Sequence, residues 1–280
     1  MREISSEIIT KTIAEMCIEA NHFLTPDMKA ALERAEGDEI SPVGKKILFQ
    51  LRENLQIAGD ETIPICQDTG MAVVFAEVGQ EVHVTGQSLA DAINEGVRKG
   101  YTEGYLRKSV VSDPLERENT KDNTPAVIHY DIVPGDKIKL TVAPKGFGSE
   151  NMSRIFMLKP AEGIEGVKNA VLAAVNDAGP NACPPIVVGV GIGGTFEKAA
   201  ELSKRSLLRP AGSHSELPHI KALEEELLEK INKSGIGPGG LGGRITALAV
   251  NILTYPTHIA GLPVAVNICC HVNRHSVREI

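Results

Sequence analysis

Three cysteines stand far apart in the sequence, each beside proline, glycine or polar turn residues. Cys66 lies in Ile-Pro-Ile-Cys-Gln-Asp-Thr-Gly, Cys183 in Asn-Ala-Cys-Pro-Pro, and Cys270 in Asn-Ile-Cys-Cys-His-Val-Asn-Arg. Three thiolates can hold three corners of a cubane iron–sulfur cluster and leave the fourth iron open as a Lewis acid. An inert buried thiol is the commoner fate of a single cytosolic cysteine. The turn-forming neighbours of all three favour a metal site.

Asp68 carries the carboxyl group nearest in sequence to one of these cysteines. It follows Cys66 by two residues, close enough to reach whatever binds at an open iron. The alternative is structural, because an Asp before Thr69-Gly70 is a typical Asx-turn residue. The residues alone favour neither interpretation.

Zinc is the alternative metal, because Cys270 is followed by His271 and His275. A structural zinc site usually supplies a second local pair of ligands, and the sequence offers none. Cys269 and Cys270 are adjacent, and neighbours on a strand point to opposite faces, so only one of them can face a cluster. Cys17 lies on the apolar face of the first predicted helix and is expected in the core.

A glycine-rich run matches a different pattern. Residues 189–194 read Gly-Val-Gly-Ile-Gly-Gly, which fits G-x-G-x-x-G between a predicted strand and a predicted helix. The dinucleotide fingerprint also needs a second strand ending in Asp or Glu about 20 residues later, whereas residues 210–218 read as a loop. We therefore interpret the glycines as a tight turn and a close backbone approach near Cys183. A nicotinamide-dependent oxidoreductase is a minor alternative.

Composition argues against several classes of protein. A net charge of −7, a pI near 5.7 and the absence of Trp disfavour nucleic-acid binding. No run approaches the roughly 20 apolar residues that span a bilayer, and the polar N-terminus has no apolar signal region, so we expect no membrane association. The five cysteines, an odd number at irregular spacings, do not form a disulfide framework. We expect a cytoplasmic protein.

The hydrophobic pattern predicts a mixed α/β fold with some α+β character. We expect one domain over residues 1–280, with a helical part at about 1–60 and a cluster-binding α/β part at about 61–280. A short strand should run into Cys66, and residues 126–142, around Pro134-Gly135-Asp136, should form a hairpin. Strands are expected at 71–78, 81–84, 185–190, 245–253 and 264–268, helices from about 26, 42, 88, 163, 195 and 218, and a long loop at 113–124.

Five motifs together resemble the iron–sulfur-dependent (class I) fumarate hydratases and their relatives, the L-tartrate dehydratases. The match covers nearly the whole chain, as the N-terminal portion or separate α subunit of such an enzyme. Any one motif is unspecific, but five in the right order are specific. They are Cys66-Gln67-Asp68-Thr69-Gly70, Leu106-Arg107, Lys145-Gly146-Phe147-Gly148-Ser149, Cys183-Pro184-Pro185, and Asn267-Ile268-Cys269-Cys270 with Arg274.

The resemblance implies a [4Fe–4S] cluster held by Cys66, Cys183 and Cys270. In the family pattern the third ligand stands four positions before an arginine, which selects Cys270 with Arg274. Cys269 then becomes a packing residue.

The resemblance also implies roles at the substrate. Asp68 becomes the acid that protonates the departing hydroxyl, and Gln67 becomes a hydrogen-bond donor. Arg107, otherwise an ordinary surface arginine, becomes a bidentate clamp for a carboxylate. The Gly148 backbone should approach the substrate, although Phe147 stands where the family often has another glycine. His258 matches a family histidine near the active site, and a core or surface histidine is the default alternative.

The activity that the resemblance implies is reversible hydration of a C4 dicarboxylate, most simply fumarate to malate, with L-tartrate dehydration as the alternative. The catalytic base belongs to a domain that follows in single-chain relatives. We therefore expect a β subunit to supply it in a hetero-oligomer. An iron–sulfur electron carrier or sensor is the alternative of another class, and the Asp68 and Arg107 motifs disfavour it.

Overall fold

The structure, a computed structural model, describes all 280 residues and contains two compact units. Unit 1 comprises residues 1–25, 55–147 and 274–280, and unit 2 comprises residues 26–54 and 148–273. The chain leaves each unit and returns to it. Each unit takes part of the helical N-terminal segment.

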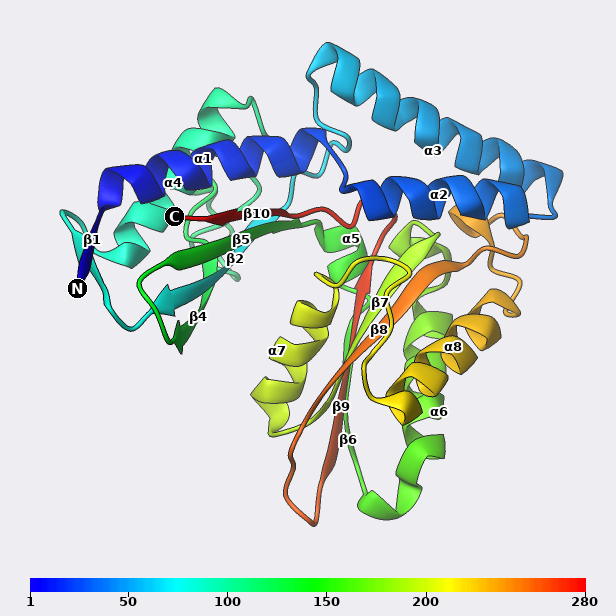
Figure 1. Ribbon diagram of the computed structural model, residues 1–280. Helices are drawn as coiled ribbons and strands as arrows, with labels where there is room; N and C mark the ends of the chain where they lie inside the picture. Colours follow the sequence, from blue (N-terminus) through cyan, green and yellow to red (C-terminus); the bar gives the residue numbers. More distant parts are fainter. The chain divides into compact units, whose positions relative to one another are not determined.

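A four-stranded sheet of order β10-β5-β2-β4 forms the centre of unit 1 (Figure 1). The strand β2 lies between the other two long strands, parallel to β4 and antiparallel to β5. Its central residues are buried on both faces, which suits an inner strand. The bounds are β2 (Met71–Gly79), β4 (Val127–Val133), β5 (Ile138–Lys145) and β10 (Ser276–Glu279).

The hairpin predicted for residues 126–142 is therefore wrong. The turn at Pro134-Gly135-Asp136 does join β4 to β5, but the two strands flank β2 and do not pair with each other. The backbone N–H groups of residues 79–81 donate to carbonyl groups of Val133, Gly135 and Lys137. The end of β2 thus occupies the place that the hairpin partner would have taken.

Two helices pack together in unit 1, α1 (Ser6–His22) and α4 (Leu89–Glu103). Gly96 allows their close approach, because a Cβ there would lie 2.6 Å from the Ile13 Cβ. Apolar residues of both helices share a core with strands β2 and β5. A small parallel sheet of β1 (Arg2–Ser5) and β3 (Val82–Thr85) completes the unit.

A second four-stranded sheet, of order β6-β9-β7-β8, forms the centre of unit 2 (Figure 1). β7 runs parallel to β8 and antiparallel to β9. The helices α6 and α8 share a core with these strands. The bounds are β6 (Arg154–Leu158), β7 (Ile186–Gly193), β8 (Ala247–Tyr255), β9 (Leu262–Cys269), α6 (Gly163–Ala178) and α8 (Pro218–Asn232).

The glycines of residues 189–194 have a packing role. A Cβ on Gly189 would lie 2.3 Å from the Ser203 carbonyl oxygen, and one on Gly191 would lie 2.1 Å from that of Ala199. Both contacts are with α7 (Phe196–Ser206). The close approach is therefore to this helix, which corrects our expectation of an approach near Cys183.

The helical N-terminal segment is confirmed by α1, α2 (Pro26–Asp38) and α3 (Pro42–Glu61). The strand expected to run into Cys66 does not form, and residues 63–70 are a loop. The Ile65 N–H bonds to the Asn21 carbonyl and not to a strand. The strands β1, β6 and β10 were not predicted. The remaining short elements are α5 (Phe147–Glu150) and 3₁₀ turns at Pro160–Glu162, Gly179–Ala182 and Pro238–Gly240.

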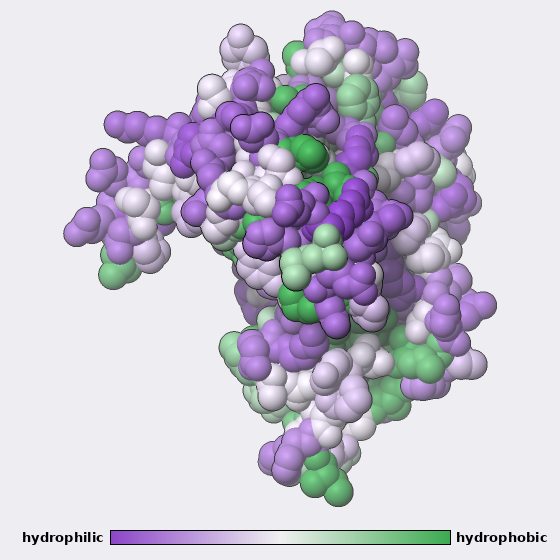
Figure 2. Space-filling model, turned by 60° about the vertical axis from the view of Figure 1, so that its left-hand side comes forward, coloured by the Kyte–Doolittle hydropathy of each residue, from purple (hydrophilic) through white to green (hydrophobic).

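None of the helices combines the length and the apolar character needed to cross a membrane. The face drawn in Figure 2 is mainly hydrophilic, with hydrophobic residues in small groups between charged and polar ones.

Candidate active site

Buried side chains of unit 1 donate hydrogen bonds to the backbone of the loop that carries Cys66, Gln67 and Asp68. The Tyr101 hydroxyl donates to the carbonyl oxygens of Thr69 and Gly70, at 2.8 and 3.0 Å. Burial raises the pKa of this phenol, so it remains a donor at neutral pH. The Asn123 amide donates to the same Gly70 carbonyl at 3.1 Å.

Gly70 lets the loop cross the end of β5 at close range. Its φ of +75° is in the left-handed region, which favours glycine. A Cβ at this position would lie 2.6 Å from the Lys145 carbonyl carbon. The glycine of the Asp-Thr-Gly sequence is therefore required by the backbone, whatever the chemistry of Asp68.

The Asp68 carboxylate accepts two backbone hydrogen bonds. The Gly70 N–H donates to Oδ1 at 3.0 Å, which is the Asx turn offered above as the structural interpretation. The Phe147 N–H donates to Oδ2 at 2.9 Å from 79 residues away, which an Asx turn does not require. Each carboxylate oxygen has about two acceptor positions. Both oxygens can therefore take a further hydrogen bond or a proton.

Gln67 belongs to the same loop as Asp68, and the backbone of Arg107 is bonded to that loop. The Thr69 hydroxyl donates to the Arg107 carbonyl oxygen at 3.1 Å, which fixes the arginine backbone to the loop. The Arg107 side chain is exposed and is not paired with a carboxylate of unit 1. Gln67 is exposed, and its Oε1 accepts from the Cys66 thiol at 3.4 Å. Unit 1 thus brings together Cys66, Gln67, Asp68 and Arg107.

Arg274 is a residue of this region whose role the sequence did not reveal. Its side chain is 4 % exposed, and Nη2 donates to the Asp68 carbonyl oxygen at 2.5 Å. Its Nε and Nη1 are buried without a hydrogen-bond partner. The only sequence signal was its spacing of four residues from Cys270, which we used to choose a ligand. Tyr101 and Asn123 carried no signal, because a buried tyrosine or asparagine can serve any loop.

Gly148 is the residue after Phe147, whose N–H donates to the Asp68 carboxylate. A Cβ there would meet no atom within 4 Å, so the chain itself does not require glycine at this position. Gly146 differs, because a Cβ there would lie 3.1 Å from the Asp68 Oδ2. The space at Gly148 is compatible with the predicted approach of a substrate.

Unit 2 brings Cys183 and Cys270 to the same end of its sheet. Cys269 pairs with Val187 at the last position of β9, and Cys183 lies three residues before β7 begins. His271, next to Cys270, places its Nδ1 3.1 Å from the Cys183 carbonyl oxygen. Cys269 is buried and Cys270 half-buried, which agrees with the alternation expected for neighbours at a strand end.

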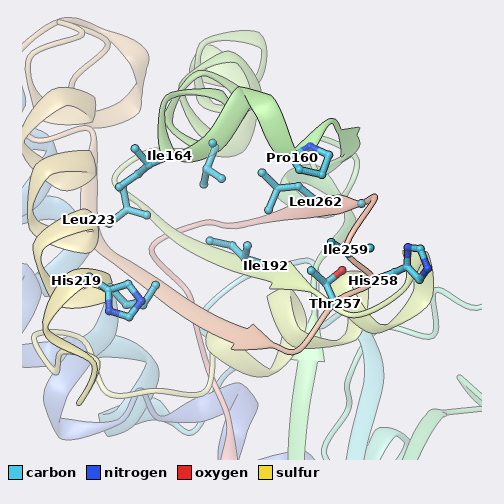
Figure 3. Close-up of a pocket in the computed structure, with 13 residues that line it drawn as sticks. Pro160, Ile164, Ile192, His219, Leu223, Thr257, His258, Ile259 and Leu262 are labelled. Atoms are coloured by element: carbon cyan, nitrogen blue, oxygen red, sulfur yellow. The ribbon is translucent and has the colours of Figure 1, made fainter.

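His258 lies at the other end of the same sheet. It is exposed on the loop between β8 and β9, beside an apolar pocket of about 440 Å³. In Figure 3, Ile164, Ile192 and Leu262 line this pocket, with His219 and His258 on opposite sides. The eight residues of β7 span roughly 25 Å at about 3.3 Å per residue. His258 therefore does not join Cys183 and Cys270 of its own chain, and its role stays a prediction.

The cysteines suit an iron–sulfur cluster by their chemistry. Cys66 and Cys270 are half-buried and Cys183 is exposed, so their thiols are accessible. Cys17 is fully buried in the apolar core of unit 1, and burial raises the pKa of its thiol to about 12, which confirms Cys17 as a core residue. Cys66 belongs to unit 1, whereas Cys183 and Cys270 belong to unit 2. No group of three or more His, Cys, Asp and Glu side chains in the structure could hold a metal ion.

A fixed carboxyl group, an exposed amide and an unpaired arginine are the groups that acid–base chemistry on a small carboxylate needs.

Comparison with known proteins identifies the family to which the chain belongs. The model of the family "Fumarate hydratase (Fumerase)" matches residues 10–279. The chain therefore belongs to the fumarate hydratase family, a family of hydro-lyases.

Individual relatives are similar over almost their whole length. A protein of Methanocaldococcus jannaschii with the provisional name L(+)-tartrate dehydratase subunit alpha is 44% identical over 278 residues, which cover 97% of each chain. The L(+)-tartrate dehydratase subunit alpha of Escherichia coli UTI89 is 33% identical over 276 residues, covering 97% of this chain and 90% of that one. The corresponding subunit of Escherichia coli O157:H7 is 34% identical over 270 residues, covering 95% and 88%.

Proposed function

We propose that this hydro-lyase adds water to, or removes it from, a C4 dicarboxylate. The observation that carries the proposal is the environment of Asp68 in unit 1. Two backbone N–H groups fix its carboxylate, and the adjacent Arg107 is not paired with a carboxylate of that unit. The bond from the Phe147 N–H goes beyond what an Asx turn requires and fixes the second carboxylate oxygen as well.

Each residue has a defined task in this proposal. Asp68 holds a proton at the carboxyl group and delivers it to the departing hydroxyl of the substrate. Arg107 binds one substrate carboxylate through two N–H donors. Gln67 donates a hydrogen bond from its exposed amide, and the open position at Gly148 admits the substrate next to the backbone.

Cys66, Cys183 and Cys270 would hold a [4Fe–4S] cluster. The bound cluster would supply a Lewis acid at its open iron, which makes hydroxide a better leaving group. This assignment rests on the accessible thiols, on the meeting of Cys183 and Cys270 at one sheet end, and on membership of the family. The buried Cys17 and Cys269 are not ligands.

A β subunit completes the enzyme in this proposal, and the two chains form a hetero-oligomer. The support is the subunit alpha in the names of the similar proteins. In this proposal the partner carries the base that removes the proton from the neighbouring carbon.

Fumarate and malate are our first candidate for the substrate pair, in line with the description of the family. L-tartrate is the second candidate, favoured by the names of the relatives described above. The two substrates differ in hydroxyl groups, and a site that hydrogen-bonds a hydroxyl discriminates strongly against an analogue that lacks it.

The test is an anaerobic assay of the reconstituted chain with its β subunit. Malate, fumarate and L-tartrate are compared by kcat/KM, with the cluster quantified in each preparation. Turnover of at least one of these substrates supports the hydro-lyase proposal, and the ratio decides the substrate. A cluster-loaded complex that turns over none of them would refute it.

A further inference from the structure

The turn that carries Cys183 has a backbone conformation that needs external support. Cys183 has a φ of +52°, in the left-handed region that costs a non-glycine residue roughly 1 kcal/mol or more. Residues in such conformations persist where the surrounding structure over-determines them. The contacts around Cys183 are therefore informative about what the turn is for.

The Cys183 N–H makes a local bond to the Pro180 carbonyl oxygen at 3.1 Å. Two further contacts come from other segments of unit 2. The Gly239 N–H donates to the Pro184 carbonyl oxygen at 2.8 Å. The His271 Nδ1 lies 3.1 Å from the Cys183 carbonyl oxygen. A carbonyl oxygen only accepts, so Nδ1 must carry the hydrogen. The contact therefore fixes which imidazole nitrogen is the donor.

The second contact also joins the two cysteines of unit 2. His271 is the residue after Cys270, and its side chain reaches the carbonyl group of Cys183 itself. The end of β9 already lies beside the start of β7, because Cys269 pairs with Val187. The imidazole thus connects the loop after β9 to the turn before β7 at the positions of the two thiols.

We propose that His271 is a positioning residue that sets the Cys183 turn relative to Cys270 before a cluster binds. The inference rests on the proposed cluster assignment, and it deepens that assignment by naming how two ligands are arranged in advance. Pre-arranged ligands lose less conformational freedom on binding. Residues that orient metal ligands typically change metal affinity about 10–100-fold when they are replaced.

Two substitutions separate the nitrogen atoms of the imidazole. In His271→Asn the amide nitrogen takes the place of Nδ1 and can still donate to Cys183. In His271→Gln the amide lies near the place of Nε2 and cannot. His271→Ala removes both, and His219→Ala, an exposed histidine of α8 at the far end of the sheet, is the control.

The first measurement uses the cluster. Anaerobically reconstituted proteins are challenged with an iron chelator, and the rate of iron loss is followed. We expect His271→Ala and His271→Gln to lose iron about 10–100-fold faster than wild type, and His271→Asn and His219→Ala to resemble wild type. Iron loss at the wild-type rate from His271→Ala, or rescue by Gln and not by Asn, would overturn the proposal.

The second measurement does not need the cluster. Hydrogen–deuterium exchange of the peptide covering residues 179–186 is compared in the apo-proteins. His271→Ala and His271→Gln should exchange faster there, with His271→Asn at the wild-type rate. If wild-type protein takes up no cluster, the proposed function fails while this comparison still decides the role of His271. Equal exchange in all variants would contradict the positioning role.

Discussion

The guanidinium of Arg274 donates to the backbone carbonyl of Asp68, 206 residues earlier in the chain, at 2.5 Å. The arginine is almost fully buried, and no carboxylate of unit 1 neutralises it. A buried charge without an ionic partner is costly to maintain. The hydrogen bond of Arg274 connects the C-terminal segment of unit 1 to the loop that carries the proposed acid, Asp68.

Arg274→Lys should therefore destabilise the protein although the charge is retained. The ammonium group cannot reproduce the directed N–H of the guanidinium, and the loss of a hydrogen bond from a charged buried donor costs roughly 1–3 kcal/mol. Urea unfolding measures the difference. Arg278→Lys is the control, because Arg278 is an exposed partner of Glu19 and should change stability by less than about 1 kcal/mol. Equal effects of the two substitutions would contradict the role of Arg274.

Asp68 and Arg107 should fail in different kinetic parameters. Asp68→Asn should lower kcat by about 10²–10⁴-fold, as expected for the loss of a general acid. Arg107→Lys keeps the charge but loses the two-pronged geometry, so it should raise KM by an amount equivalent to roughly 1–3 kcal/mol. Asn at position 68 can accept only one of the two backbone N–H groups, so cluster content is measured in parallel. If both cluster-loaded variants had unchanged kinetics, Asp68 would be a turn residue and Arg107 a surface arginine without a catalytic role.

Gly148→Ala separates a substrate contact from a structural need. The added methyl group meets no atom of the chain within 4 Å, so the melting temperature should stay the same. KM should rise if a substrate approaches this backbone. Gly146→Ala is the contrast, because its methyl group would press on the Asp68 carboxylate and should lower kcat. An unchanged KM for Gly148→Ala would remove Gly148 from the site.

Glu39 should make the stability of unit 2 depend on acid pH. Its buried carboxylate accepts from the backbone N–H groups of Ile40, Ser41, Arg244 and Ile245. Burial raises the pKa of this carboxyl, but these donors outweigh burial and bring the pKa below its usual value. A lowered pKa in the folded state gives stability that is present above the unfolded pKa of about 4.3. That stability is lost as the pH falls through the folded value.

Glu39→Gln should accordingly cost roughly 1–3 kcal/mol at neutral pH, because one acceptor oxygen and the charge are removed. The difference from wild type should shrink below about pH 4, where the wild-type carboxyl is protonated too. Unfolding free energies measured from pH 3 to pH 7 test this. Glu36→Gln, which breaks only a surface pair with Arg52, should show a small and flat difference. A pH-independent effect of Glu39→Gln would contradict the role of the charge.

Local signals predicted most of the helices. The Ser88 hydroxyl does accept from the Asp91 N–H at the start of α4, and α2 and α3 do begin at Pro26 and Pro42. The strand pairing could not be predicted, because it depends on distant segments. The turn at Pro134-Gly135-Asp136 was identified correctly, but nothing near it indicates that β2 pairs with both neighbouring strands.

In the candidate site, too, local features could be predicted from the sequence and long-range contacts could not. Sequence motifs indicated Asp68, Arg107 and the cysteines as candidates, because their types and spacing match a known family. The structure added the contacts of Arg274, Tyr101 and His271, which join segments far apart in the chain. Such contacts leave no local pattern. The interleaving of the two units is also invisible locally, since β10 pairs with a strand that ends 131 residues before it begins (276 minus 145).

The central claim is that Cys66, Cys183 and Cys270 together hold a [4Fe–4S] cluster. The most direct test is iron and sulfide content with Mössbauer spectra of anaerobically reconstituted protein. Wild type, Cys17→Ala and Cys269→Ala should each show a [4Fe–4S] cluster with one distinct iron site. Cys66→Ser, Cys183→Ser and Cys270→Ser should each fail to retain it, because a soft thiolate ligand is removed. A stable cluster in Cys270→Ser together with its loss in Cys269→Ala, or no cluster in the wild type, would contradict the account.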